Sequence, residues 1–198
     1  MKLYFAGPSP FVRKCRIVAR EKGLADRIEE IAVNPYENAP ELMATNPVVQ
    51  VPTLIAADGL PLTDSPVICE YLDGLGDGPR LLPGSGADRL RVRRLETLAN
   101  GALEMGVKWL LELRRPESER SPSWIARWSH NLDRSLDALE AARPDPAVLD
   151  MGTITAGVAV TWISFRHPDH DWQTGRPNLV ALQTALEARP SFVATRPV

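Results

Sequence analysis

The sequence predicts two domains of different class, an α/β domain followed by an all-helical one. Residues 1–77 alternate short aliphatic runs with amphipathic helical stretches, whereas residues 87–198 carry only helical periodicity. A Gly- and Pro-rich stretch, Gly74 to Gly86, has the composition of a linker between them. The chain of 198 residues is long enough for two small domains.

The N-terminal elements are expected in the order strand, helix, strand, short helix, hairpin, helix. Their expected spans are Lys2–Phe5, Pro10–Lys22, Ile28–Val33, Ala39–Met43, Thr53–Ala56, Pro61–Thr63 and a helix capped by Ser65 with Pro66 at its first position. The pair Asp58-Gly59 marks the hairpin. A crossover helix implies a parallel strand pair and a hairpin adds antiparallel strands, so this order predicts a thioredoxin-like fold.

The C-terminal domain is expected to be a helical bundle. Its expected helices are Ala87–Arg115, Ser123–Ala142, Thr153–Phe165 and Pro177–Ala188. Four tryptophans fall on these helices, where filling the core is their usual role: Trp109, Trp124, Trp128 and Trp162.

Composition argues against several classes of function. The net charge of −2 gives no reason to expect nucleic acid or membrane partners, and no stretch is apolar enough to span a bilayer. Cys15 and Cys69 lie in expected helices without CxxC spacing, which predicts neither a disulfide framework nor a zinc site. Basic residues interrupt the apolar run that a signal peptide would need, so a cytoplasmic location is expected. The three histidines lack metal-ligand spacing and are expected at the surface.

Pro52 is anomalous because it lies in a β-branched and aliphatic run, Gln50 to Ile55. Proline supplies no N–H to a strand ladder, so it is confined to edges, first positions and bulges. An ordinary turn before a strand would explain it. A cis bond after Val51 would instead turn the Val51 backbone outward, where it could hold an extended ligand.

Two helix starts carry polar groups that could bind a ligand. Ser9-Pro10 is typical of a simple N-cap, yet the same hydroxyl at a helix N-terminus could stabilise a ligand thiolate. Asp64-Ser65-Pro66 is also a simple cap, yet Asp64 could bind an ammonium group while Ser65 and the helix N-terminus bind a carboxylate.

These three motifs together resemble the glutathione transferase superfamily. The resemblance extends over nearly the whole chain and is carried by the segments Ser9-Pro10, Asn46-Pro47-Val48-Val49-Gln50-Val51-Pro52-Thr53-Leu54, Asp64-Ser65-Pro66-Val67-Ile68, Arg91-Val92-Arg93 with Glu96, Arg134 to Glu140, and Arg176-Pro177-Asn178-Leu179 to Phe192. The C-terminal segments are similar to those of a bacterial subfamily.

The resemblance implies a glutathione-binding domain at residues 1–77 and a helical domain at residues 87–198. It implies that Pro52 is cis and that Val51 pairs its backbone with the cysteinyl part of glutathione. Asp64 and Ser65 would hold the γ-glutamyl end, and Gln50 would lie near the glycyl carboxylate. Glutathione would be the co-substrate, with no metal.

Ser9 would be the catalytic hydrogen-bond donor to the glutathione sulfur. Tyr4 is a poor rival because it lies within the first strand, and Cys15 lies too far into the first helix. The expected activity is conjugation of the thiolate to small hydrophobic electrophiles, as in detoxification, or peroxide reduction. Pro8, Phe11, Met105 and Trp109 are candidates to line the electrophile site, and each is equally explicable as core.

Two positions depart from the family pattern. The family commonly has glycine and a basic residue before Val-Pro, whereas this chain has Val49-Gln50, which offers an amide but no charge to the glycyl carboxylate. The family's capping box in the third C-terminal helix pairs Ser or Thr with Asp three residues later, and here Thr153 is followed by Ala156.

The resemblance also implies a homodimer, with the N-terminal domain of one subunit meeting the long helix of the other. Two alternatives stay open. One is a binding or regulatory protein that kept the fold without the chemistry, because fold does not establish function. The other is a glutathione-dependent isomerase or dehalogenase.

Overall fold

A computed structural model describes residues 1–197, which form two compact units. The first unit comprises Met1–Leu81 and the segment from Pro190 onward, and the second comprises Leu82–Arg189. The first unit contains β1 (Lys2–Phe5), α1 (Pro10–Glu21), η1 (Ala25–Arg27), β2 (Glu29–Ala32), η2 (Pro35–Glu37), α2 (Pro40–Thr45), β3 (Thr53–Ile55), β4 (Pro61–Leu62), α3 (Ser65–Leu75) and α8 (Pro190–Val193). We call it the sheet unit.

The four strands of the sheet unit form one mixed sheet in the order β2-β1-β3-β4. β1 is parallel to β2, with α1 as the crossover, and antiparallel to β3, while β3 and β4 form the antiparallel hairpin that Asp58-Gly59 predicts. Gly59 has φ +90° at the turn, a conformation that glycine adopts at little cost. The thioredoxin-like topology predicted from the sequence is therefore confirmed.

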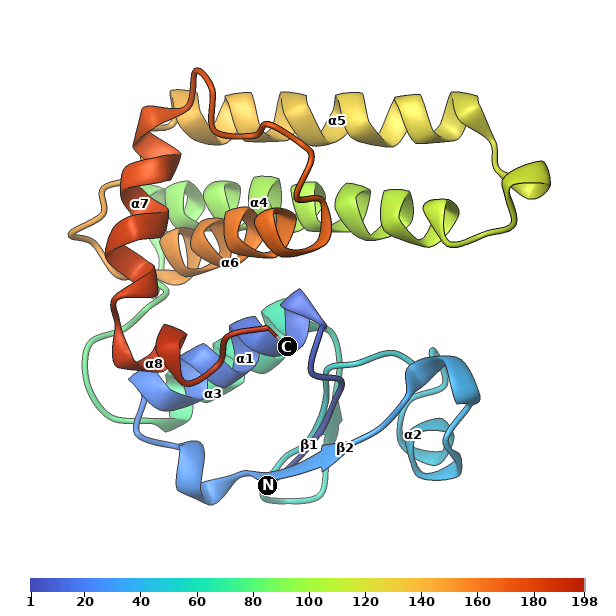
Figure 1. The fold of residues 1–198 in the computed structure, drawn as a ribbon. Coiled ribbons are helices and arrows are strands. Elements are labelled where there is room, and N and C mark those ends of the chain that lie inside the picture. Colours follow the sequence, from blue (N-terminus) through green and yellow to red (C-terminus); the bar gives the residue numbers. More distant parts are fainter. Residues whose placement is uncertain (198) are drawn as a thin grey trace. The chain divides into compact units, whose positions relative to one another are not determined.

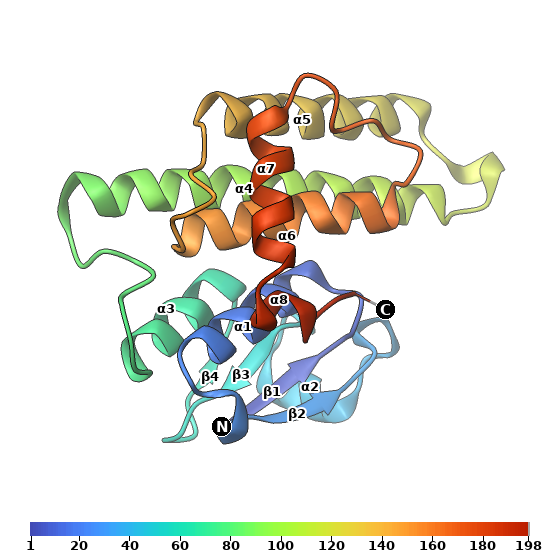
Figure 2. The ribbon, with the colours of Figure 1, turned by 60° about the vertical axis from the view of Figure 1, so that its left-hand side comes forward.

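Helices α1 and α3 pack against each other beside the sheet (Figure 2). Their apolar faces bury Val12, Ile17 and Leu72, and a buried ion pair joins their C-terminal ends. Lys22 Nζ lies 3.3 Å from Asp73 Oδ1, and both side chains are almost fully buried. Asp73 Oδ1 also accepts from the Leu81 N–H at 2.9 Å. The same carboxylate therefore attaches Leu81, the last residue of the stretch Met1–Leu81, to α3.

The C-terminal helix α8, which the sequence analysis did not separate from the helical domain, groups with the sheet unit. It packs against α1, where Arg13 Nη2 donates to the Phe192 carbonyl oxygen at 3.2 Å. The Arg13 guanidinium also lies over the Phe192 ring, 5.3 Å from its centroid. These polar and cation–π contacts explain why the segment from Pro190 groups with the sheet unit, although residues 87–198 were expected to form one helical domain.

We call the second compact unit the helical unit. It contains α4 (Gly86–Leu113), η3 (Glu117–Glu119), α5 (Pro122–Ala141), α6 (Met151–Arg166) and α7 (Pro177–Glu187). The long helix α4 packs against both α5 and α6, and α7 packs against α6 and α5 (Figure 1). The predicted helical bundle is thus present. None of the helices within residues 1–197 combines the length and apolarity needed to cross a bilayer.

Two expectations for the helical unit are wrong. Trp124 was expected in the core, but it is 51% exposed and stacks on Trp128 with ring centroids 5.4 Å apart. The capping box of α6 was expected to lack half of its pair, but it is complete one turn earlier. The Asp150 carboxylate accepts from Thr153 N at 2.8 Å, and Thr153 Oγ1 accepts from Asp150 N at 3.0 Å.

Candidate functional site

The sheet topology brings the three sequence motifs to one edge. β1 and β4 each run antiparallel to β3, so their C-terminal ends lie at the edge where β3 begins. Ser9 follows β1, Val51-Pro52 precedes β3, and Asp64-Ser65 follows β4. The positive N-terminal ends of α1 and α3 are at this same edge, which suits an anionic or extended polar ligand.

Ser9 caps α1 and still has a proton to donate. Its Oγ accepts from Val12 N at a long 3.4 Å, and Pro10 occupies the first helical turn, as the capping interpretation predicts. A hydroxyl that accepts one hydrogen bond keeps its own O–H free for a second partner. The side chain is partly exposed, so capping and ligand binding are compatible at Ser9.

The segment before β3 presents unpaired backbone groups. The Val51–Pro52 peptide bond is cis, as the family resemblance implies, and so is the non-proline bond Thr63–Asp64. Within residues 1–197 neither the N–H nor the C=O of Val51 has a hydrogen-bond partner, because the β1–β3 ladder begins at Thr53. The Gln50 side chain is exposed beside it.

The third motif differs from the expectation in one respect. Asp64, not Ser65, is the N-cap of α3, and its carboxylate accepts from the Ser65 N–H. Ser65 is the first helical residue, is 0% exposed, and its Oγ has no hydrogen-bond partner among the described residues. The capping interpretation of Ser65 is therefore wrong, and a buried hydroxyl is left to be satisfied by something else.

Two reduced cysteines lie directly behind Ser65. Cys69 Sγ donates to Cys15 Sγ at 3.7 Å, and Cys15 Sγ donates to the Ser65 carbonyl oxygen at 3.9 Å. Burial raises the pKa of the Cys15 thiol well above its usual value, and the hydrogen bond with Cys69 adds to that shift. The Cys15 thiol is therefore not poised as a nucleophile, and Cys69 is buried beside it. Tyr4 is buried within β1.

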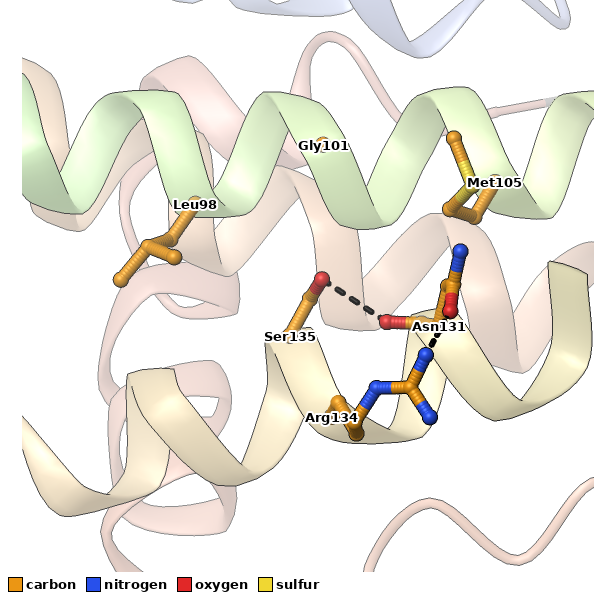
Figure 3. A pocket seen from close by; sticks show the side chains of 6 residues that line it. All are labelled: Leu98, Gly101, Met105, Asn131, Arg134 and Ser135. Atoms are coloured by element: carbon orange, nitrogen blue, oxygen red, sulfur yellow. Dashed lines mark hydrogen bonds between the residues drawn. The ribbon is translucent and has the colours of Figure 1, made fainter.

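The candidate electrophile residues fall in both compact units. Pro8 and Phe11 belong to the sheet unit, while Met105 and Trp109 belong to α4 of the helical unit. Met105 lines an open surface pocket of about 310 Å³ between α4 and α5. Figure 3 shows the residues that line it: Leu98, Gly101 and Met105 of α4, and Asn131, Arg134 and Ser135 of α5.

Trp109 belongs to an aromatic cluster that sequence reasoning missed. Its indole stacks on His167 with ring centroids 4.2 Å apart, and it makes a T-shaped contact with His170 at a centroid separation of 5.4 Å. His167 is 6% exposed and its Nε2 donates to the Gly106 carbonyl oxygen at 3.0 Å. The expectation of surface histidines is wrong for His167, whose pKa is lowered by burial.

The sequence carried no signal for this cluster, because His167 and Gly106 are 61 residues apart. His170 is largely buried too, with Nε2 3.1 Å from Asp133 Oδ1. His130 is exposed, as expected.

A family model described as "Glutathione S-transferase, N-terminal domain" matches residues 8–75, the span that holds all three motifs. The "Uncharacterized GST-like protein YibF" of Escherichia coli (strain K12) is 35% identical over 201 residues, covering 100% of this chain and 98% of that protein. The chain therefore belongs to the glutathione S-transferase superfamily, and the predicted membership and architecture are confirmed.

Solved structures agree with this assignment. A glutathione transferase family member from Pseudomonas fluorescens Pf-5, with bound glutathione, has a TM-score of 0.95 and 33% identity, covering 100% of this chain and 98% of that one. A glutathione S-transferase from Methylobacterium radiotolerans, in complex with glutathione sulfonate, has a TM-score of 0.90 and 33% identity, covering 99% and 94%.

Proposed function

We propose that this protein is a glutathione transferase that conjugates the glutathione thiolate to small hydrophobic electrophiles. One observation carries the proposal. Ser9, the unpaired Val51 backbone, and Asp64 with the unpartnered Ser65 hydroxyl meet at a single edge of the sheet. The glutathione bound to the Pseudomonas fluorescens relative, which matches this chain along its full length, supports the same ligand.

Each group has a ligand atom to which its chemistry is suited. The Asp64 carboxylate would accept from the γ-glutamyl ammonium, and the Ser65 hydroxyl would donate to the γ-glutamyl carboxylate. The Val51 N–H and C=O would pair with the cysteinyl residue as a short antiparallel ladder. Gln50 would donate its amide to the glycyl carboxylate, a weaker contact than a cation would supply.

Ser9 would act on the sulfur. Its free O–H would donate to the thiolate, and the N-terminus of α1 would add a favourable field, so that the thiol loses its proton more readily. In substitution, the sulfur lone pair forms a C–S bond while the leaving group departs with its electron pair. In peroxide reduction, two glutathione molecules give their disulfide, an alcohol and water.

The electrophile site is proposed from the sequence alone, by its resemblance to the glutathione transferase superfamily. Pro8, Phe11, Met105 and Trp109 would contact the electrophile, and a detoxification role and a cytoplasmic location stay predictions.

We also propose a homodimer. Met43 and Val48, which precede β3, are 51% and 62% exposed, so the sheet unit offers apolar side chains that could contact the open pocket between α4 and α5 of a second copy.

The test combines binding and turnover. Isothermal titration with glutathione should show one site per chain, and conjugation of a generic aryl halide should be measurable. Ser9→Ala should lower kcat/KM by about tenfold or more while glutathione still binds, and Ser9→Thr, which keeps both hydroxyl and cap, should retain activity. Binding without turnover in the wild-type protein would instead assign a non-catalytic glutathione-binding role. Absence of binding would refute the proposal.

A second measurement tests the dimer. Light scattering coupled to size exclusion should give about twice the chain mass for the wild-type protein, and Val48→Asp should shift it toward the monomer because it introduces a charge into an apolar contact. A monomeric wild-type protein would refute this part.

A further inference from the structure

Asn46 is a buried amide whose polar atoms are all used within the sheet unit. The residue is 1% exposed and follows α2. Its Oδ1 accepts from Val48 N at 2.9 Å, and its Nδ2 donates to Thr53 Oγ1 at 2.9 Å and to the Gln50 carbonyl oxygen at 3.2 Å. Thr53 Oγ1 in turn donates to the same Gln50 oxygen at 2.8 Å.

These hydrogen bonds determine the path of the chain toward β3. The segment between Asn46 and Thr53 has no strand partner, so its shape depends on contacts within the loop. The Asn46 backbone contributes as well, since its carbonyl accepts from Val49 N at 2.9 Å. Val49 has φ +55°, an uncommon conformation for a β-branched residue that the surrounding hydrogen bonds must hold.

The same amide connects two parts of the candidate site. Asn46 Nδ2 lies 3.5 Å from Thr63 Oγ1, and Thr63 directly precedes Asp64. One end of the network therefore fixes Gln50, next to the Val51 backbone, while the other end touches the strand that leads to Asp64 and Ser65. The position needs a side chain that donates from one atom and accepts at another, as the asparagine amide does.

We propose that Asn46 is a positioning residue for glutathione. It holds the unpaired N–H and C=O of Val51 at a fixed place relative to Asp64 and Ser65. The ligand would touch both groups at once, so a small displacement of one would weaken binding out of proportion to the hydrogen bonds lost. The inference rests on the proposed function, because it concerns the same site.

The test uses Asn46→Asp, which has the same shape and keeps an acceptor for Val48 N. It lacks the donor and directs a charged oxygen toward the Gln50 carbonyl. We expect the dissociation constant for glutathione to rise about tenfold or more in calorimetry at pH 8. At saturating glutathione, kcat should fall by less than about threefold, because Asn46 does not contact Ser9.

A pH profile separates positioning from general damage. Burial at this position should raise the pKa of the introduced carboxyl, so that it begins to protonate toward pH 5. Protonation restores a donor, so the glutathione affinity of the folded variant should partly recover there. The matched control is Asn34→Asp, in the same unit. Asn34 makes similar contacts, accepting from Tyr36 N at 3.1 Å, but it lies on the exposed side of the chain. Its affinity should stay within twofold of wild type at both pH values.

Thr53→Val is the second variant, because it removes the partner of Asn46 Nδ2 with little change of shape. It decides the question if Asn46→Asp does not fold. A folded variant that binds glutathione within twofold of wild type overturns the inference, even if its melting temperature falls. A wild-type protein that fails to bind glutathione overturns the proposed function and this inference with it.

Discussion

Replacing Ser65 by alanine should stabilise the protein and weaken glutathione binding at the same time. The Ser65 hydroxyl is 0% exposed and has no partner within residues 1–197, so the folded state carries its desolvation cost without a compensating hydrogen bond. That cost is about 1 to 3 kcal/mol. Because Asp64 is the N-cap of α3, the substitution removes no cap.

The two effects can be given magnitudes. Relief of about 1 to 3 kcal/mol raises the melting temperature by roughly 2–4 °C per kcal/mol for a chain of this size. A hydrogen bond to a charged carboxylate contributes about 1.5 to 3 kcal/mol, so its loss raises the dissociation constant for glutathione about 10- to 150-fold. Differential scanning fluorimetry without ligand and calorimetry with glutathione measure the two quantities.

The sign of the stability change discriminates between two roles of Ser65. If Ser65 were the helix cap, as the sequence first indicates, alanine would cost about 0.5 to 2 kcal/mol. Ser135→Ala is the control, since Ser135 Oγ donates to the Asn131 carbonyl oxygen at 2.9 Å and the substitution removes that hydrogen bond. Relief of an unpaired hydroxyl therefore cannot stabilise this variant. A melting temperature that falls in Ser65→Ala, or an affinity changed by less than threefold, would refute the reasoning.

Three further predictions concern stability. Gly106→Ala should lower the melting temperature, because the added Cβ would lie 2.9 Å from Trp162 Cζ3. Gly101→Ala on the same helix has nothing within 4 Å of the added Cβ, so it should stabilise the protein by about 1 kcal/mol and raise the melting temperature. Asp150→Ala should cost about 0.5 to 2 kcal/mol in urea unfolding, because it removes half of a complete capping box; an unchanged midpoint would contradict this. The raised pKa of Cys15 means that the unfolded thiol ionises first, so stability should fall as pH rises above about 8.5, and the fall should be smaller in Cys15→Ala.

Local patterns were sufficient to predict the order of the elements. The proline at the first position of α1 and the Asp58-Gly59 turn each act over a few residues, and the sequence displays them directly. The helix α8 was missed because four residues give too little periodicity. Its place beside α1 depends on Arg13 and Phe192, which are 179 residues apart.

The sequence predicted which residues belong to the candidate site, but not which of Asp64 and Ser65 caps the helix α3. Asp64 and Ser65 are both good capping residues, so their order in the sequence cannot say which one caps α3. The outcome depends on the backbone at Asp64, which is extended, and on the packing that buries Ser65. The capping box at Asp150 was missed for a similar reason: Thr153 was expected to be the cap, whereas it is the N3 partner of Asp150, which lies three residues earlier.

The difference between Asp64 and Ser65 also explains how one short motif can serve folding and binding together. Asp64 satisfies the first N–H of α3 and remains exposed, so the helix is capped without ligand. Ser65 does not cap the helix, and its buried hydroxyl has no partner among the described residues; under the proposed function, a ligand bound at the edge where β3 begins would supply one. A site arranged in this way trades folded-state stability for affinity, because the polar group that weakens the empty protein is the one that a carboxylate would satisfy.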